Sequence, residues 1–294
     1  LIENGFKVGS YTSPHLLQFN ERIKINKTPA STEEICFAFE TIEEARGKIT
    51  LTFFEYSTLA AFLIFSKKDL DIVILEVGLG GRLDAVNIID PDVSIITNIG
   101  LDHTAILGDD PEKIAYEKSG IMRKNKDTVI GYDTPHMSIK KNSKVVGSNL
   151  HILNEQYSYK IISNKNWLFS NSDNVKIEYD NPGLNGIIQI NNAAAAIQAV
   201  HCCKKITLDK DKTNLGLRKA TILGRFQVEN TSPRTILDIA HNEQSVEKLL
   251  ENLEIYYPRT CLHAVFAILQ DKDVDKILNM LKGKFMSWHI SNSE

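Results

Sequence analysis

The sequence is poor in cysteine and contains no cysteine pair with the C-x-x-C spacing. Its four cysteines are Cys36, Cys202, Cys203 and Cys261. This usage argues against a disulfide frame or a zinc knuckle and favours reduced thiols in a cytosol. We expect all four to be ordinary buried residues.

Long apolar runs and a large net charge are also missing. No run approaches the roughly 20 residues needed to span a bilayer, and no signal peptide is visible. The formal charge of −3 provides no whole-chain basic surface for nucleic acid. We therefore expect a soluble cytoplasmic protein with neither a membrane nor a nucleic acid as partner.

An initiator methionine is absent as well. The chain begins at Leu1, and residues 1–4 have the pattern of a helix end that Gly5 closes. We therefore expect a segment upstream of Leu1 to be missing. With 294 residues, 43% of them hydrophobic, the chain is long enough for two domains. We predict these domains at residues 1–221 and 222–294.

The order of the predicted elements indicates an α/β fold. Residues 31–46, 51–65 and 110–124 have helical patterns, and apolar runs at 72–75 and 93–97 predict strands that are buried on both faces of a parallel sheet. Short alternating segments up to about residue 186 predict a small antiparallel β insertion. An alanine-rich helix follows, and the strands and helices after residue 222 predict a second α/β unit.

Polar residues follow the predicted strands. Ser13 comes after a strand at 6–11, Glu76 after the run at 72–75, and His103 after the run at 93–97. Ligands of open parallel sheets bind beyond the carboxyl ends of the strands, so we expect these side chains to lie together. Oxygen donors suit Mg²⁺, and the added imidazole suits Mn²⁺ as well.

The second α/β unit repeats this pattern, because the predicted strand at 234–239 has Asp238 at its end and His241 just after it. A helix cap and an isolated histidine would explain these two residues equally simply. From the patterns alone, a phosphate or metal site is favoured and the substrate stays open.

Several strings together resemble the folylpolyglutamate synthase/dihydrofolate synthase family of the Mur ligase superfamily. They are YTSPHL with FNERI, TFFEYSTLAAF, LEVGLGGRLDAVN, TNIGLDHTAILG, IAYEKSGI, GRF and LDIAHN, at 11–23, 52–62, 75–87, 97–108, 114–121, 224–226 and 237–242. The resemblance implies a mostly parallel ATPase domain with a small antiparallel insertion, followed by a partial Rossmann-like C-terminal domain.

The resemblance also implies an ATP-dependent amide ligase of folate biosynthesis. ATP would phosphorylate a pterin carboxylate, and the amine of L-glutamate would attack the acyl phosphate. The implied co-substrate and cofactors are ATP and two Mg²⁺ ions. The implied acceptors are dihydropteroate and folate, and we expect a monomer.

The resemblance assigns roles to residues of this chain by matching positions. It implies metal ligands at Ser13, Glu76, His103 and a carbamylated Lys118, the last three being catalytic. It implies ATP contacts at Gln189, Asn192, Arg225, Asp238 and His241. It implies a pterin pocket at Thr52, Phe54, Asp84 and Ala85.

The sequence departs from the family at the phosphate loop, because no G-x-x-x-x-G-K-[ST] string occurs in it. Ile188 also stands where the family usually has histidine. Three hypotheses follow. The chain is an interior piece of a folate ligase that is inactive alone, a Mur-type ligase with a UDP-linked peptidoglycan precursor, or a non-catalytic remnant that binds folate.

Overall fold

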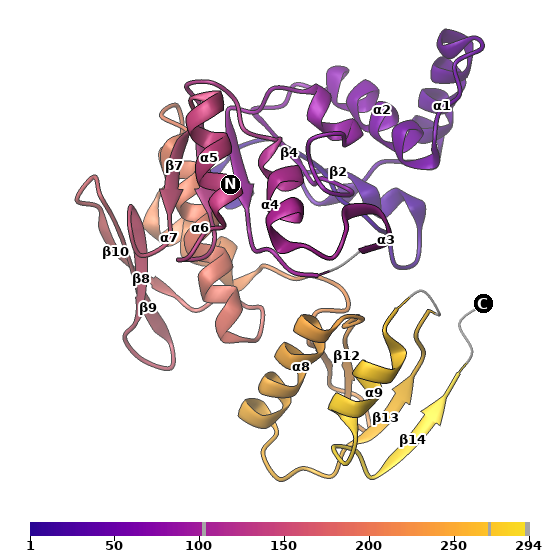
Figure 1. Ribbon diagram of the computed structural model, residues 1–294, viewed down its shortest axis with the longest axis vertical. Helices are drawn as coiled ribbons and strands as arrows, with labels where there is room; N and C mark the ends of the chain where they lie inside the picture. The colour runs from indigo at the N-terminus through magenta and orange to yellow at the C-terminus, as the bar shows by residue number, and fades with distance from the viewer. Residues whose placement is uncertain (102–103, 270–271, 292–294) are drawn as a thin grey trace. The chain divides into compact units, whose positions relative to one another are not determined.

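The computed structural model describes residues 1–101, 104–269 and 272–291 (Figure 1). Its internal contacts form two compact units, residues 1–181 with 191–219 and residues 182–190 with 220–294. The predicted division after residue 221 lies near this one, while the roles predicted for the two parts stay predictions. Among the described residues, every helix is too short or too polar to span a bilayer.

The first unit contains a four-stranded sheet in the order β3-β2-β1-β4. Strand β1 pairs with β4 in parallel and with β2 in antiparallel orientation. The strands are β1 (Val8–Tyr11), β2 (Ile23–Ile25), β3 (Thr28–Pro29) and β4 (Ile72–Leu75). Because β1 and β4 run in parallel, their carboxyl ends lie at the same edge of the sheet.

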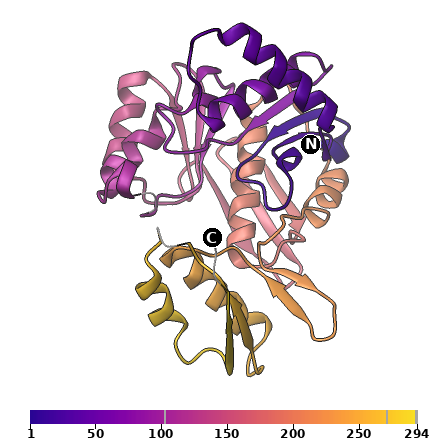
Figure 2. The same cartoon turned by 90° about the vertical axis from the view of Figure 1, so that its right-hand side faces the viewer.

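Two helices pack together beside this sheet, α1 (Thr32–Arg46) and α2 (Phe53–Ser66) (Figure 2). Each begins with a capping box, in which Ser31 pairs with Glu34 and Thr52 with Glu55. These reciprocal hydrogen bonds satisfy backbone N–H groups that a helix start leaves unpaired. The core of this region includes Tyr11 and Ile23, both fully buried.

Strand β4 is more exposed than the sequence predicts. The side chains of Val73 and Ile74 are 43% and 47% exposed. Among the described strands, β4 pairs with β1 alone, and β5 belongs to another sheet. The prediction that β4 is buried on both faces is therefore wrong, because its second edge carries no neighbour in the described residues.

The second sheet of this unit is parallel, in the order β5-β6-β7. Its strands are β5 (Val93–Ile96), β6 (Asp127–Ile130) and β7 (Asn149–Ile152), and its helices are α3 (Thr104–Leu107), α4 (Pro111–Ser119) and α5 (Met137–Val146). The sequence reasoning missed α5 and β7, which it placed in the antiparallel insertion. Helix α5 has many polar residues, and its buried face is formed by Ile139 and Ser143 alone, so its sequence lacks a clear helical pattern of apolar residues.

The antiparallel insertion itself is confirmed as a meander in the order β10-β9-β8. Its strands are β8 (Tyr157–Ile161), β9 (Asn166–Asn171) and β10 (Lys176–Asp180). The predicted alanine-rich helix is α6 (Ile187–Cys202). Helix α7 (Lys210–Arg218), which the sequence reasoning missed, begins at an Asp209 cap.

Three short 3₁₀ helices complete the described part of the first unit, and a short strand begins the sheets of the second. They are η1 (Ile2–Asn4), η2 (Phe19–Arg22), η3 (Ala85–Ile88) and β11 (Gln227–Glu229). Gly5 closes η1 with φ of 95°, in agreement with the predicted C-cap.

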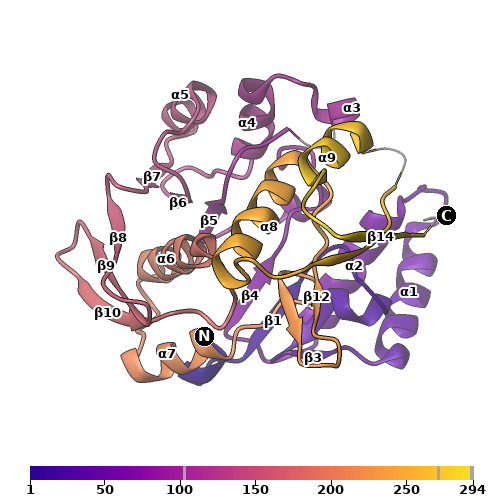
Figure 3. The same cartoon turned by 90° about the horizontal axis from the view of Figure 1, so that it is seen from below.

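The second unit has two-stranded sheets β11–β12 and β13–β14. Its further elements are β12 (Thr235–Leu237), α8 (Glu243–Tyr256), β13 (His263–Phe266), α9 (Val274–Leu281) and β14 (Ser287–Ile290). Figure 3 shows α8 and α9 together on one face of the parallel pair β13–β14. Val246 and Ile277 form the core there with Phe266 and Trp288, which confirms the predicted α/β unit.

A chain of hydroxyl groups crosses the parallel sheet and generates a stability prediction. The buried Thr128 Oγ1 lies 2.8 Å from Ser94 Oγ and 2.9 Å from Ser148 Oγ. Thr128→Val keeps the shape but leaves the buried hydroxyl of Ser94 without this partner. We expect the free energy of unfolding to fall by roughly 1–3 kcal/mol in urea denaturation. The exposed control Thr134→Val should change it by less than about 0.5 kcal/mol.

Candidate active site

Ser13 and Glu76 lie together at the carboxyl ends of β1 and β4. The parallel register pairs Tyr11 with Leu75, so the residues that follow them emerge side by side. Glu76 N donates to Tyr11 O at 2.9 Å, and Ser13 N donates to Glu76 Oε2 at 2.9 Å. The structure therefore brings together two of the predicted metal ligands. His103 and Asp102 lie outside the described residues.

The FNERI segment, residues 19–23, anchors the turn that carries Ser13 through hydrogen bonds. The Glu21 carboxylate accepts hydrogen bonds from the backbone N–H groups of Leu16, Leu17 and Gln18 at 2.9, 2.9 and 2.7 Å. These hydrogen bonds lower the pKa of Glu21, and the bond from Leu16 has the largest effect. Glu21 therefore stays ionised at neutral pH. The sequence reasoning gave Glu21 no role, although an acid beside a polar turn is a usual anchor for backbone N–H groups.

The glycine-rich loop after Glu76 packs against the end of α4, the helix that carries Lys118. Arg82 N donates to Glu117 O at 2.8 Å, and the Arg82 guanidinium forms an ion pair with the Glu117 carboxylate at 2.9 Å. A Cβ at Gly81 would lie 2.9 Å from Glu117 O and 3.0 Å from Lys118 O. Only glycine permits this approach, which ties the backbone of Lys118 to the loop that begins at Glu76.

A groove of about 450 Å³ lies between α2 and the 82–88 segment. Its lining residues include Asp84 and Ala85, two of the predicted pterin contacts. Leu51, Leu59 and Phe62 give it an apolar wall, and Glu55 and Arg82 add polar groups. An apolar groove with a few polar groups is the usual form of a site for a flat organic ligand.

The Asp84 carboxylate also shapes the backbone of this groove. Its Oδ1 accepts from Val86 N at 2.9 Å, and its Oδ2 accepts from Gly78 N at 3.1 Å and Leu79 N at 2.9 Å. A carboxylate has about four acceptor positions, so three are used by the protein itself. The predicted contact from Asp84 to pterin N–H groups stays a prediction.

Thr52 and Phe54 have structural contacts that the sequence reasoning did not foresee. Thr52 Oγ1 accepts from Glu55 N at 3.2 Å as the cap of α2. The Phe54 ring packs beside Gly78, and its centroid lies 5.9 Å from that of Tyr11. Neither residue is among those that line the groove.

On α6, Gln189 is partly buried and Asn192 is exposed. Between them the buried Asn191 donates from Nδ2 to Gly131 O at 2.8 Å, which ties α6 to the end of β6. The sequence reasoning did not identify this anchor. The predicted ATP contacts of Gln189 and Asn192 remain predictions.

In the second unit, Asp238 organises the segment around Arg225. Its Oδ2 accepts from Phe226 N and its Oδ1 from Ala240 N, both at 2.8 Å. Phe226 is buried at φ of 43°, a strained value for a bulky residue, and its ring packs on Tyr256 and Tyr257.

His241 follows β12 and lies just before the Asn242 cap of α8. Its Nδ1 lies 2.9 Å from Ile239 O, which fixes the imidazole through an N–H donor at Nδ1. Asp238 does not cap α8, so the explanation of Asp238 as a helix cap is wrong.

Comparisons with known proteins identify the family. The profile for the Mur ligase middle domain matches residues 23–200, and that for the Mur ligase glutamate ligase domain matches residues 224–292. Dihydrofolate synthase/folylpolyglutamate synthase of Buchnera aphidicola from Schizaphis graminum is 40% identical over 99% of this chain and 69% of the relative. The chain belongs to the dihydrofolate synthase/folylpolyglutamate synthase family.

Solved structures of this family share the fold. Escherichia coli FolC in complex with DHPP and ADP has a TM-score of 0.92 at 33% identity, over 100% of this chain and 74% of that chain. A bifunctional folylpolyglutamate synthase/dihydrofolate synthase with Mn, AMPPNP and L-glutamate bound has a TM-score of 0.88 at 36% identity, over 98% and 68%. These matches confirm the predicted fold class and the class of ATP-dependent ligases in folate metabolism.

The contact of Gly78 with Phe54 in this family member generates a second prediction. A Cβ at Gly78 would lie 2.5 Å from Phe54 Cζ, so Gly78→Ala should lower the free energy of unfolding by roughly 1–3 kcal/mol. The smaller ring-free side chain of Phe54→Leu should remove most of this penalty in the double variant. A double-variant cycle by urea denaturation measures the coupling between the two sites.

Gly216 in α7 is the matched control, because a Cβ there would meet its nearest atom at 3.6 Å. Gly216→Ala should stabilise the chain by up to about 1 kcal/mol through helix propensity. Equal losses for both alanine variants would contradict the proposed contact.

Proposed function

We propose that this chain carries the metal-binding and pterin-binding parts of a ligase that joins L-glutamate to dihydropteroate or folate. ATP would phosphorylate the pterin carboxylate, and the glutamate amine would displace phosphate from the resulting acyl phosphate. The observation that carries the proposal is the hydrogen bond from Ser13 N to Glu76 Oε2 at the carboxyl ends of two parallel strands. Family membership supports the same reaction.

The residues at this position fit a hard divalent cation. The Glu76 carboxylate, which is exposed, and the Ser13 hydroxyl, which is partly exposed, supply oxygen donors of the kind that Mg²⁺ or Mn²⁺ requires. A bound dication would offset the charge that develops on the transferring phosphoryl group. The chain itself orients Glu76 by two backbone hydrogen bonds, one from Ser13 N and one from its own N–H to Tyr11 O.

A second ion is part of the proposal, with His103, Glu76 and a carbamylated Lys118 as ligands. Its support is the packing of the Glu76 loop on the backbone of residues 117 and 118 through Gly81. Carbamylation would replace the ammonium of Lys118 with a carboxylate-like oxygen donor, which a dication binds readily. His103 joins the proposal from the sequence resemblance alone.

The groove between α2 and the 82–88 segment is the proposed pterin site. Asp84 and Ala85 line it, and the apolar wall suits a flat heteroaromatic ring. Phe54 would support this wall by packing its ring against Tyr11, and Thr52 would support it by capping α2. In the second unit, we propose that Arg225 and His241 contact the nucleotide and that Asp238 holds their loop in place.

The test requires a longer protein that joins residues 1–294 to the flanking segments of the Buchnera relative. We expect Mg²⁺-dependent phosphate release from ATP that requires both L-glutamate and dihydropteroate or folate. A UDP-linked peptidoglycan precursor should not replace the pterin acceptor. Release that requires the UDP-linked acceptor would contradict the proposal, and folate binding without release would identify a non-catalytic protein.

Glu76→Gln in this longer protein gives a third prediction. The loss of a charged metal ligand should lower kcat/KM by roughly 10²- to 10³-fold, because several kcal/mol of charge stabilisation disappear. The apparent Mg²⁺ requirement should rise in parallel. Glu44→Gln, on the exposed face of α1, should leave both quantities unchanged. Unaltered Mg²⁺ dependence in the Glu76 variant would remove Glu76 from the metal site.

Residues 1–294 alone give a fourth prediction. The sequence contains no Gly-Lys-Ser/Thr phosphate loop, so no string of that type can cradle the β- and γ-phosphates. We expect no ATP- and glutamate-dependent phosphate release by the 294-residue chain. Folate- and glutamate-dependent turnover by this chain would contradict the prediction.

A further inference from the structure

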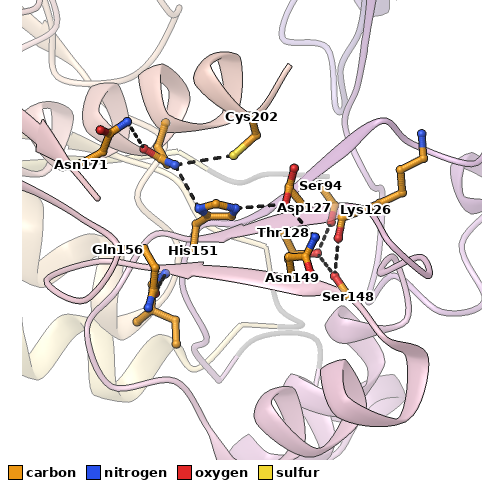
Figure 4. A network of polar contacts seen from close by, with 12 residues as sticks. Ser94, Lys126, Asp127, Thr128, Ser148, Asn149, His151, Gln156, Asn171 and Cys202 are labelled. Atoms are coloured by element: carbon orange, nitrogen blue, oxygen red, sulfur yellow. Dashed lines mark hydrogen bonds and ion pairs between the residues drawn. The ribbon is translucent and has the colours of Figure 1, made fainter. Parts of the chain in front are cut away.

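Three residues of types that bind transition metals in many proteins lie together beside the parallel sheet. Asp127 is the first residue of β6, His151 is in β7, and Cys202 is the last residue of α6. One ligand atom from each lies within 4.8 Å of the other two. His151 Nε2 is 3.1 Å from Asp127 Oδ1, and Figure 4 shows Cys202 projecting from its helix toward this pair.

The register of the sheet explains why the strand residues meet. Asp127 is opposite Asn149, and Val129 is opposite His151. Residues two apart on a strand share a face, so Asp127 and His151 project from the same face of neighbouring strands. Cys202 reaches this face from α6, and three separate elements thus supply the three side chains.

A shell of amides surrounds the cluster. Gln198, one helical turn before Cys202 and only 1% exposed, donates from Nε2 to His151 Nδ1 at 3.1 Å and to Cys202 Sγ at 3.6 Å. Asn149 Nδ2 donates to Asp127 Oδ1 at 3.2 Å, and Asn171 Nδ2 donates to Gln198 Oε1 at 3.4 Å (Figure 4). Outer partners of this kind hold metal ligands in orientation.

We propose that Asp127, His151 and Cys202 form a Zn²⁺ site that joins the carboxyl end of α6 to β6 and β7. The carboxylate, imidazole and thiolate form the mixed oxygen, nitrogen and sulfur set that Zn²⁺ accepts, with water as a fourth ligand. The thiolate distinguishes this site from a Mg²⁺ site, because Mg²⁺ selects oxygen ligands.

The geometry needs a small adjustment only. Metal–ligand bonds of about 2.0–2.3 Å in a tetrahedron separate the ligand atoms by roughly 3.3–3.8 Å. His151 Nε2 lies 3.1 Å from Asp127 Oδ1, and the three ligand atoms lie within 4.8 Å of one another. Side-chain shifts of about 1 Å therefore suffice.

Binding changes the protonation of two ligands. The S–H bond of Cys202 breaks, a zinc–sulfur bond forms, and the proton passes to solvent. His151 binds through Nε2, and its ring proton then resides on Nδ1, facing Gln198. Rotation of the Gln198 amide by a half turn presents Oε1 to this proton and gives up the 3.4 Å hydrogen bond that Oε1 accepts from Asn171 Nδ2.

A catalytic thiol is the alternative function for this cluster. Cys202 is only partly exposed at the end of α6, which limits the access of a substrate to its thiol. The cluster is also remote from the proposed nucleotide contact on the same helix. Asn192 and Cys202 are ten residues apart, about 15 Å along the axis.

Cobalt provides the test on the 294-residue chain after treatment with a chelator. We expect one equivalent of Co²⁺ to produce a thiolate-to-cobalt charge-transfer band, which Zn²⁺ then abolishes. The band should disappear in Cys202→Ser and persist in Cys203→Ser, the matched change one residue along. It should also persist in Cys36→Ser, which alters an exposed thiol. Co²⁺ at Glu76 and Ser13 cannot produce this band, because those residues carry no sulfur.

The absence of the band in the unaltered chain, or its survival in Cys202→Ser, would overturn the proposal. Gln198→Met removes the outer partner and should weaken Zn²⁺ binding about 10- to 100-fold. If Cys202→Ser does not fold, thermal unfolding of the unaltered chain decides. Zn²⁺ should raise its midpoint and a chelator should lower it again, and an unchanged midpoint would overturn the site.

Discussion

The parallel pairing of β1 with β4 is the constraint on which the candidate active site depends. It sets Tyr11 opposite Leu75, and from this register follow the hydrogen bonds that place Ser13 against the Glu76 carboxylate. Two residues to which the sequence reasoning gave no role then hold the loops on either side. Glu21 accepts a hydrogen bond from the turn that follows Ser13, and Gly81 packs against the end of α4. The proposed metal position is thus built mainly from backbone hydrogen bonds, with the Glu76 side chain exposed and that of Ser13 partly exposed.

Two aspartates illustrate how backbone order and ligand contact overlap. The Asp84 carboxylate accepts hydrogen bonds from three backbone N–H groups beside the proposed pterin groove, and Asp238 accepts two beside Arg225. A short carboxylate reaches nearby N–H groups readily, so it can set a loop conformation before any ligand arrives. Substitutions at these positions will therefore change loop structure.

Periodicity and caps predicted much of the fold, because they are local signals. Helix α1 and strand β4 have the predicted bounds or nearly so. Helices α5 and α7 were missed because polar residues outnumber apolar ones in both, so their buried faces are short. The exposure of Val73 depends on which strands are neighbours, a non-local fact that its own run of residues does not contain.

The site residues show the same division between local and distant information. Motif strings predicted that Ser13 and Glu76 matter, and strand ends explained why they meet. The cluster of Asp127, His151 and Cys202 had no motif, because its members come from three elements and the cysteine spacing was unremarkable. The expectation that all four cysteines are buried is wrong, because Cys36 and Cys261 are exposed and Cys202 and Cys203 are only partly buried.

The free edge of β4 among the described strands has a consequence for the protein in solution. Its main-chain N–H and C=O groups on that side can recruit a further strand, and Val73 and Ile74 add apolar surface on both faces. Burial of these apolar side chains drives such recruitment, so sulfate and similar salts strengthen it. The same salts screen surface ion pairs and weaken them. Strand recruitment at this edge and the surface ion pairs should thus respond to salt in opposite directions.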